Sequence, residues 1–259
     1  MHLESTGFVL RTYPLRESDR IVVLFSRAEG KVRGVAPRAG VSRRRFGGAL
    51  SVLGEVEFSY REKEGQDLGR LEWCRVLAPT PGEGRDLDAF YVSTYMAEVL
   101  EQMGREREAD EHLYRLTHAC AGALAQGLTA TAVARYFEVW TLRLGGLLPD
   151  LTACAGCGRD LARTGAALLP GEEAVCAGCC GRDHTASLLP GEAVALVRRM
   201  LARPPAEAVE PLPLPDHLAA VARMAAAQFL HVTERPFRTA AMVAVGHDEA
   251  AAAAPGRQR

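Results

Sequence analysis

Two pairs of cysteines place the strongest constraint on what this chain can fold into. Each pair has the sequence C-A-G-C, and 18 residues lie between the two pairs. Two intervening residues allow both sulfurs of one turn to reach the same ion, and this spacing is typical of four-cysteine zinc sites. We therefore expect one zinc ion, bound by the four sulfurs of Cys154, Cys157, Cys176 and Cys179.

A site of this composition is expected to be structural. Four thiolates fill a tetrahedral zinc site, so no position is left for water or substrate. Two alternatives stay open: the thiols could be unliganded or redox-active, or Cys180 could replace the adjoining Cys179 as the fourth ligand. We expect the nearby His184 to be solvated, and Cys74 and Cys120 to be packing residues.

Residues 1–78 have the pattern of short β-strands. Apolar and polar side chains alternate imperfectly in five runs, which are separated by turn residues such as Glu29-Gly30. The runs are Gly7–Arg11, Ile21–Phe25, Lys31–Ala36, Glu55–Tyr60 and Leu68–Val76. The glycine-containing stretch Ala39–Leu53 is predicted to form a loop and a short helix. Five short strands predict a small barrel of the OB-fold type over residues 1–80.

A helical period replaces the strand pattern from Asp86 onward, after boundary signals at Pro79, Pro81 and Gly82. Apolar faces predict helices around Phe90–Met103, Leu113–Leu124, Val133–Leu147, Gly191–Leu201 and Asp216–Val232. The Pro-rich segment Pro204–Pro215 is interpreted as a linker. We therefore expect an α+β protein. Its barrel precedes a helical domain over residues 81–245, which contains a zinc finger at 152–182, and a disordered tail follows at 246–259.

The formal net charge of -1 hides an uneven distribution of charge. Residues 1–48 contain ten Lys and Arg against four Asp and Glu, which makes this segment +6. Basic side chains bind polyanions by neutralising phosphates, and a small barrel offers a groove for single strands. The candidate DNA-binding residues lie on the strands and in an arginine-rich loop: Arg11, Arg20, Lys31, Arg33, Arg38, Arg43, Arg44 and Arg45.

Other interpretations of this segment stay open. The basic residues could form a solvated face with no ligand, because runs of charge are weak indicators of binding. Tyr13 and Phe46 are candidates for stacking on bases, with burial as the alternative for each.

Several classes of enzyme lack their signature in this sequence. There is no P-loop, no G-x-S-x-G and no H-E-x-x-H, and the acidic pairs Asp86/Asp88 and Asp110/Glu111 stand at predicted helix starts, where carboxylates cap the helix. We therefore expect neither catalysis nor a small-molecule substrate. A signal peptide and an apolar run of roughly 20 residues are also missing, so we expect a cytoplasmic protein with no membrane partner.

The order of these features resembles the RecO family of recombination mediators. The resemblance is carried by the basic sequence GFVLRTYPLRESDRIVVLFSRAEGKVRGVAPRAG, by SRRRFGGAL, and by VARYFEVWTLRLGGLLPDLTACAGCG with the second C-x-x-C after it. It covers roughly residues 5–245. Its most specific parts are Glu17, Asp19 and Gly30 near the N-terminus and the junction Arg135–Cys157.

The resemblance implies a function. Members of this family have an N-terminal OB-fold and a helical C-terminal domain, with a zinc finger in many of them. They bind single- and double-stranded DNA, anneal complementary strands, contact the single-strand-binding protein (SSB) and work with RecR to load the recombinase in gap repair. By this resemblance the basic residues lie in the DNA-binding part, the four cysteines match the zinc ligands, and the protein is bacterial, cytoplasmic and nucleoid-associated. The family's lysine-rich loop is arginine-rich here, which should preserve contact with phosphates. A protein-interaction scaffold without direct DNA binding is the alternative.

Overall fold

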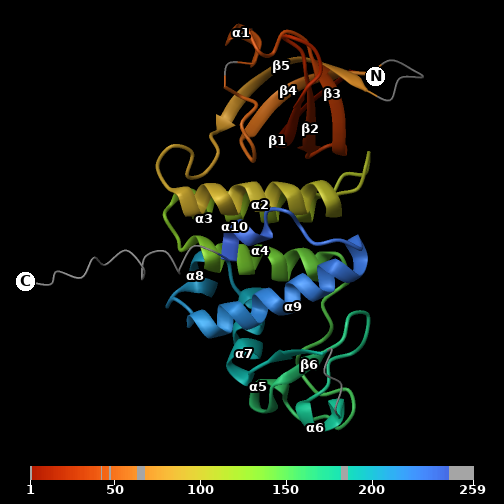
Figure 1. The fold of residues 1–259 in the computed structure, drawn as a ribbon, viewed down its shortest axis with the longest axis vertical. Coiled ribbons are helices and arrows are strands. Elements are labelled where there is room, and N and C mark those ends of the chain that lie inside the picture. Colours follow the sequence, from red (N-terminus) through yellow and green to blue (C-terminus); the bar gives the residue numbers. More distant parts are fainter. Residues whose placement is uncertain (1, 42, 47, 63–67, 182–185, 245–259) are drawn as a thin grey trace, which may run out of the picture.

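The chain folds into a barrel that stands on a helical body, with the cysteine segment at the opposite end of the body (Figure 1). The computed structural model describes residues 2–41, 43–46, 48–62, 68–181 and 186–244. The expected disordered tail at 246–259 and His184 lie outside these residues. No helix in the described part of the chain is both long enough and apolar enough to cross a membrane.

Five strands form a closed barrel in the order β1-β2-β3-β5-β4. They are β1 (His2–Pro14), β2 (Arg20–Ser26), β3 (Gly30–Ala36), β4 (Glu55–Arg61) and β5 (Gly69–Ala78), so the five predicted strands are confirmed. All neighbours are antiparallel except β3 and β5, which pair in parallel through Gly34 opposite Gly69. A short helix, α1 (Arg43–Phe46), lies between β3 and β4, as the sequence predicted.

The barrel strands are buried on both faces where they meet the helices. Val9, Val22 and Leu24 point into the barrel, whereas Phe8 and Phe25 belong to a second core that continues into the helical body. Side chains at successive positions of a strand point to opposite faces, so apolar residues occupy consecutive positions here. This double burial is the reason that the alternation in the sequence is imperfect.

Three helices follow the barrel: α2 (Leu87–Met103), α3 (Glu111–Ala125) and α4 (Ala130–Leu144). Asp86 and Asp110 cap the first two, because their carboxylates accept from the backbone N–H groups of Ala89 and Leu113. The helix predicted around Phe90–Met103 is confirmed as α2, but more of its surface is buried than its apolar face indicates. This helix lies between the barrel and the other helices and buries most of its circumference, including Glu98.

The body is completed by α7 (Gly191–Ala202), α8 (Pro205–Val209), α9 (Pro215–Thr233) and α10 (Ala240–Ala244). The interpretation of Pro204–Pro215 as a plain linker is wrong, because α8 lies within it. Pro205 occupies the first turn of α8, where a helix needs no N–H donor, and Ala208 and Val209 are fully buried. A helix of five residues is too short to show a helical period in the sequence.

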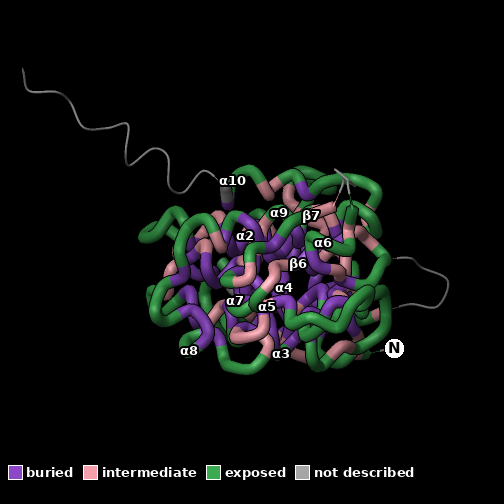
Figure 2. Tube along the Cα trace, turned by 90° about the horizontal axis from the view of Figure 1, so that it is seen from below, coloured by how far each residue is buried: buried purple, intermediate pink, exposed green. Residues whose placement is uncertain are grey.

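The described part of the cysteine segment contains short elements: α5 (Leu161–Thr164), β6 (Ala166–Leu168), α6 (Ala177–Cys180) and β7 (Ser187–Leu189). The strands β6 and β7 pair in antiparallel fashion. Seen from this end of the molecule, Figure 2 shows buried stretches at the centre and exposed loops around them. The elements α5 and β7 pack against α7 and α9, so the segment is attached to the body through these two helices.

Candidate metal centre and nucleic-acid interface

The four predicted zinc ligands lie together. The sulfurs of Cys154, Cys157, Cys176 and Cys179 are all within 4.8 Å of one another. Cys154 and Cys157 come from the turn before α5, whereas Cys176 directly precedes α6 and Cys179 lies in it. Cys180 is not part of this group, which favours Cys179 as the fourth ligand.

The spacing of the sulfurs suits a tetrahedral metal ion. A Zn–S distance of about 2.3 Å puts tetrahedral sulfurs about 3.8 Å apart, and the sulfurs of Cys157 and Cys176 are 3.8 Å apart. A side chain at Gly156 would come within 3.2 Å of the Cys179 sulfur, so the turn needs a small residue there. The four cysteines could therefore hold a metal ion, and four ligands from the protein would close the site.

Hydrogen bonds around the cluster favour thiolates at two of its positions. The Arg159 guanidinium donates to the sulfur of Cys157 at 3.3 Å and, with the Arg159 backbone N–H, lowers the pKa of Cys157 to about 6. The backbone N–H of Cys176 donates to Cys154 and lowers the pKa of that thiol. Cys179 instead has its pKa raised to about 12 by its contacts with the other sulfurs. Four clustered thiolates repel one another, so full deprotonation requires a bound cation.

An arginine of the body fixes the start of the cysteine segment. Arg198 on α7 donates to the carbonyl oxygens of Leu151 and Thr152 and to the carboxylate of Asp160, at 2.8 Å for the last. Asp160 also caps α5 by accepting from Ala162 N. This one side chain therefore ties the first cysteine turn to the helical body.

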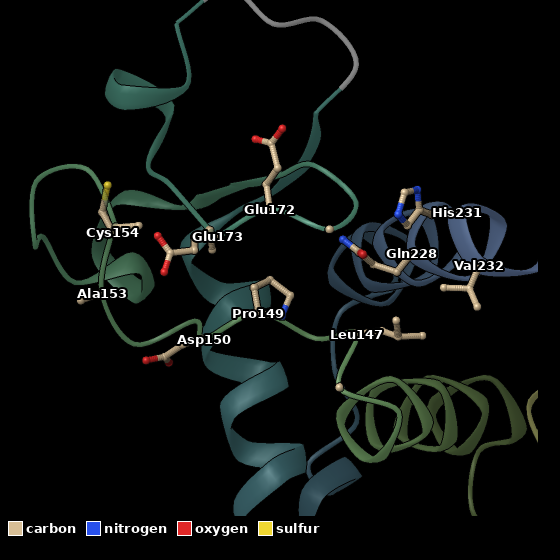
Figure 3. Close-up of a pocket in the computed structure, with 14 residues that line it drawn as sticks. Leu147, Pro149, Asp150, Ala153, Cys154, Glu172, Glu173, Gln228, His231 and Val232 are labelled. Carbon is tan, nitrogen blue, oxygen red and sulfur yellow. The ribbon is translucent and has the colours of Figure 1, made fainter.

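A pocket of about 570 Å³ lies between the cysteine segment and α9 (Figure 3). Gln228 points into it from α9, whereas the carboxylates of Asp150 and Glu173 point away from α9 and that of Glu172 points upward in this view. Cys154 on its rim belongs to the metal cluster.

The predicted DNA-binding residues fall into two groups in the structure. The first lies at the end of the barrel away from the helices, where the β1–β2 turn meets the loop after β3. Arg38 N donates to the Asp19 carboxylate, and Gly40 N donates to Ser18 O. Arg20 pairs with Pro14 and Ala36 at this end, and Arg38 and helix α1 follow β3 there. Arg45 donates to Pro37 O and lies over the Phe46 ring.

The second group lies where the barrel meets the body. Arg11 forms an ion pair with Glu101 of α2 at 2.8 Å. Lys31 is only 7% exposed and donates to the carbonyl oxygen of Glu101 at 2.7 Å. Arg33 is exposed and forms an ion pair with Glu106 at 2.9 Å. These three residues thus already have protein partners, which the sequence pattern does not reveal.

A row of partly exposed side chains lies between the two groups on the outer face of the barrel. Tyr13, Ile21 and Val35 are direct neighbours across β1, β2 and β3. Tyr13 is 38% exposed, and Ile21 and Val35 are half-buried. Arg11 and Arg33 occupy the next row of the same face, on either side of Val23. Phe46, the other stacking candidate, is buried in the barrel.

Sequence reasoning missed several residues of these sites. Arg159 and Arg198 gave no signal, because single arginines near cysteines are common. Glu98, Arg235 and Arg238 were also missed; they meet the barrel only through the packing of α2 against the segment after α9. For Glu98, the sequence signal is a charged residue among the apolar positions of α2.

Comparison with known proteins agrees with this architecture. A family model described as "Recombination protein O N terminal" matches residues 1–80, and one described as "Recombination protein O C terminal" matches residues 84–232. The DNA repair protein RecO of Koribacter versatilis is 44% identical over 158 residues, which are 61% of this chain and 64% of that protein.

Two further relatives match over a larger share of the chain. The DNA repair protein RecO of Anaeromyxobacter sp. strain K is 37% identical over 212 residues, which are 81% of this chain and 84% of that protein. The corresponding protein of Geobacter metallireducens is 35% identical over 203 residues, which are 77% of this chain and 82% of that protein.

A barrel with a basic face, joined to a helical body with a four-cysteine cluster, defines together with these matches a DNA repair protein of the recombination mediator class. The chain belongs to the RecO family. The resemblance stated from the sequence is thereby confirmed.

Proposed function

We propose that this chain is a non-enzymatic mediator of recombination in gap repair, and that its barrel is an OB-fold that binds DNA. In this proposal it binds single- and double-stranded DNA, anneals complementary strands and helps RecR to load the recombinase onto DNA covered by SSB. The cysteine cluster would hold one structural zinc ion. The protein would act in the cytoplasm, in association with the nucleoid.

The row of Tyr13, Ile21 and Val35 is the observation that carries this proposal. Aromatic and apolar side chains on an exposed sheet provide stacking surfaces for bases, and basic residues beside them attract the phosphates. The strands β2 and β3 form the face by which OB-folds bind oligonucleotides. Such a surface binds single strands with little preference for sequence, as annealing of any complementary pair requires.

Annealing by such a surface needs no bond chemistry. Two DNA strands repel each other through their phosphates, and a surface that neutralises both backbones lowers this repulsion. The arginines at the free end of the barrel, and Arg235 and Arg238 beside its junction with the body, provide two separate regions of positive charge. This separation supports the simultaneous binding of two strands.

The proposal is tested by binding of DNA at several salt concentrations. The triple variant Arg43→Ala, Arg44→Ala, Arg45→Ala should bind single-stranded and duplex DNA more weakly and with a smaller salt dependence. For six to ten phosphate contacts the wild type should lose about 10³–10⁵ in affinity between roughly 50 and 200 mM salt. Fluorescence anisotropy of labelled oligonucleotides measures both quantities.

A matched control removes the same charge elsewhere. Arg115, Arg203 and Arg223 are exposed residues of the helical body, and their combined replacement by alanine should leave the affinity nearly unchanged. Equal losses in the two triple variants would indicate a general charge effect and contradict a site on the barrel. A wild-type protein without salt-dependent binding would favour the protein-interaction scaffold.

A further inference from the structure

A basic groove of about 700 Å³ opens between the barrel and the helical body. We define it by four barrel residues and two residues that follow α9: Arg11, Tyr13, Lys31, Arg33, Arg235 and Arg238. The two arginines after α9 lie about 200 residues along the chain from the basic N-terminal segment. Positive charge on this groove therefore comes from both parts of the molecule.

The acidic side chains in the groove are already engaged by the protein. Glu101 accepts from Arg11 at 2.8 Å and from the Tyr13 hydroxyl at 3.3 Å. Glu98 is 4% exposed and accepts from the backbone N–H groups of Arg238 and Thr239. These two carboxylates offset part of the positive charge, but the groove is lined by five Lys and Arg against two Glu and so keeps an excess of positive charge.

Two of the basic groups remain available to a ligand. Arg235 is exposed and forms no ion pair with any residue that the structure describes. The Arg238 side chain is 77% exposed, and its guanidinium is 3.6 Å from the Glu98 carboxylate. Lys31, by contrast, is buried and satisfies the C-terminal end of α2, so a structural role accounts for it.

The backbone holds these arginines in place independently of their side chains. The N–H groups of Arg238 and Thr239 and the Thr239 hydroxyl all bind Glu98, with distances of 3.0, 2.8 and 2.6 Å. The segment after α9 is thus fastened to α2 at the edge of the barrel. A structural role for its arginine side chains is not needed to explain this attachment.

We propose that the groove continues the DNA-binding face of the barrel onto the helical body, with Arg235 and Arg238 as contacts for the phosphates of the same strand. The proposal rests on the function proposed above. A strand that stacks on Tyr13 would leave the barrel next to Arg33 and reach the two arginines directly, because all four line one groove. The body would therefore lengthen the binding site beyond the barrel.

The length of the DNA distinguishes this site from the barrel alone. Single OB-folds bind about 4–16 nucleotides, so we compare oligothymidines of about 4 and about 30 nucleotides. The variants Arg235→Ala and Arg238→Ala should weaken binding of the longer strand and leave the shorter one nearly unaffected. For the longer strand, each should reduce the slope of log K against log salt by about 0.7, the value for one phosphate of a single strand.

Three controls make the result decisive. Arg223→Ala removes an exposed charge from α9 outside the groove and should have no effect on either oligonucleotide. Arg235→Lys keeps the charge and should keep the slope. Unfolding midpoints equal to wild type for both alanine variants would show that the fold is intact, as the backbone attachment to Glu98 predicts.

The inference is overturned if Arg235→Ala and Arg238→Ala bind the longer strand with the wild-type slope while the triple variant of α1 loses affinity. In that case DNA binding is limited to the barrel and the proposed function stands. If the triple variant also binds as wild type does, the proposed function itself fails. An equal effect of Arg235→Ala on both oligonucleotides would also contradict the inference, because it would place this residue in the barrel's own site.

Discussion

Glu98 shows how one buried carboxylate can determine the position of a distant segment. It lies on α2 and binds residues 140 and 141 positions further along the chain. Burial by itself would raise the pKa of Glu98, but the hydrogen bonds from Thr239 and Arg238 outweigh that effect and lower the pKa. The folded state therefore prefers the ionised form of Glu98 more strongly than the unfolded chain does.

This preference predicts a contribution of Glu98 to stability that depends on pH. An unfolded glutamate titrates near a pKa of about 4.3, so the contribution should be complete above that pH and should disappear as the pH falls through the lowered pKa of the folded state. Glu98→Gln should therefore reduce the free energy of unfolding by about 1–3 kcal/mol at neutral pH and by less near pH 3. Urea unfolding at the two pH values measures the difference.

Asp88→Asn is the control for this experiment, because Asp88 is an exposed carboxylate on the same helix. It should change the stability by less than about 1 kcal/mol. An equal loss in Glu98→Gln at both pH values would show that the packing of Glu98, and not its charge, supports the segment after α9.

At the scale of elements, the cysteine segment is the part that is least able to fold alone. Its helices α5 and α6 have four residues each, and its strands β6 and β7 have three. Helices and two-stranded sheets of this size are not stable in water without other support. The support comes from Arg198 on α7 and, in our proposal, from a zinc ion between the two cysteine turns.

Loss of a cysteine ligand should therefore unfold this segment first. We expect one zinc per chain in the purified protein, and less zinc, a lower unfolding midpoint and lower solubility in Cys154→Ala and Cys176→Ala. Mass spectrometry of the metal content and hydrogen exchange of residues 152–181 measure these effects. Any loss of DNA binding should be secondary to the loss of structure.

Cys180→Ala is a matched control, because Cys180 adjoins Cys179 and is not part of the four-sulfur group. This variant should keep its zinc and its stability. Loss of zinc in Cys180→Ala would assign that residue as the fourth ligand. A wild-type protein that is stable and contains no zinc would contradict a structural metal site and reopen the redox alternative.

The whole molecule depends on the contact between barrel and body. A shared core joins Phe8 and Phe25 to the helices. The start of β3 also binds the segment after α2, because Lys31 N donates to Arg105 O and Arg107 N donates to Lys31 O. Interfaces of this kind, with a continuous apolar core and backbone hydrogen bonds, do not permit free motion between domains. The groove between the two parts should therefore keep its shape.

Gly30 lies at this contact and allows a direct test of it. Its φ is +62°, and a side chain there would overlap the carbonyl oxygen of Glu108. Gly30→Ala should lower the free energy of unfolding by at least about 3 kcal/mol, because the left-handed backbone and the overlap both oppose it. Thermal or urea unfolding measures the loss.

Gly84→Ala separates these two causes. Gly84 has a similar φ of +70°, but no atom lies within 4 Å of the position of an added side chain. Its replacement should cost only about 1–2 kcal/mol, the penalty for a left-handed residue. Similar losses in the two variants would mean that the barrel and the body do not make the close contact described here.

The sequence predicted much of the fold but less of the sites. Each of the five strands and the caps Asp86 and Asp110 could be located, because alternation, turns and caps depend on a few neighbouring residues. Helix α8 and the short elements near the cysteines could not, since they contain too few residues to show a period. The burial around α2 was also missed, because it depends on two layers that lie far apart in the sequence.

By itself, the sequence determined the four-sulfur cluster, the barrel strands and the excess of positive charge near the N-terminus. These features follow from local spacing and composition, which are independent of how distant segments pack. Only the tertiary structure decided which basic residues are open to a ligand. Lys31 is buried against Glu101, 70 residues away, whereas Arg235 is brought to the barrel and stays exposed. The availability of a charge depends on its partners, and those partners come from other parts of the chain.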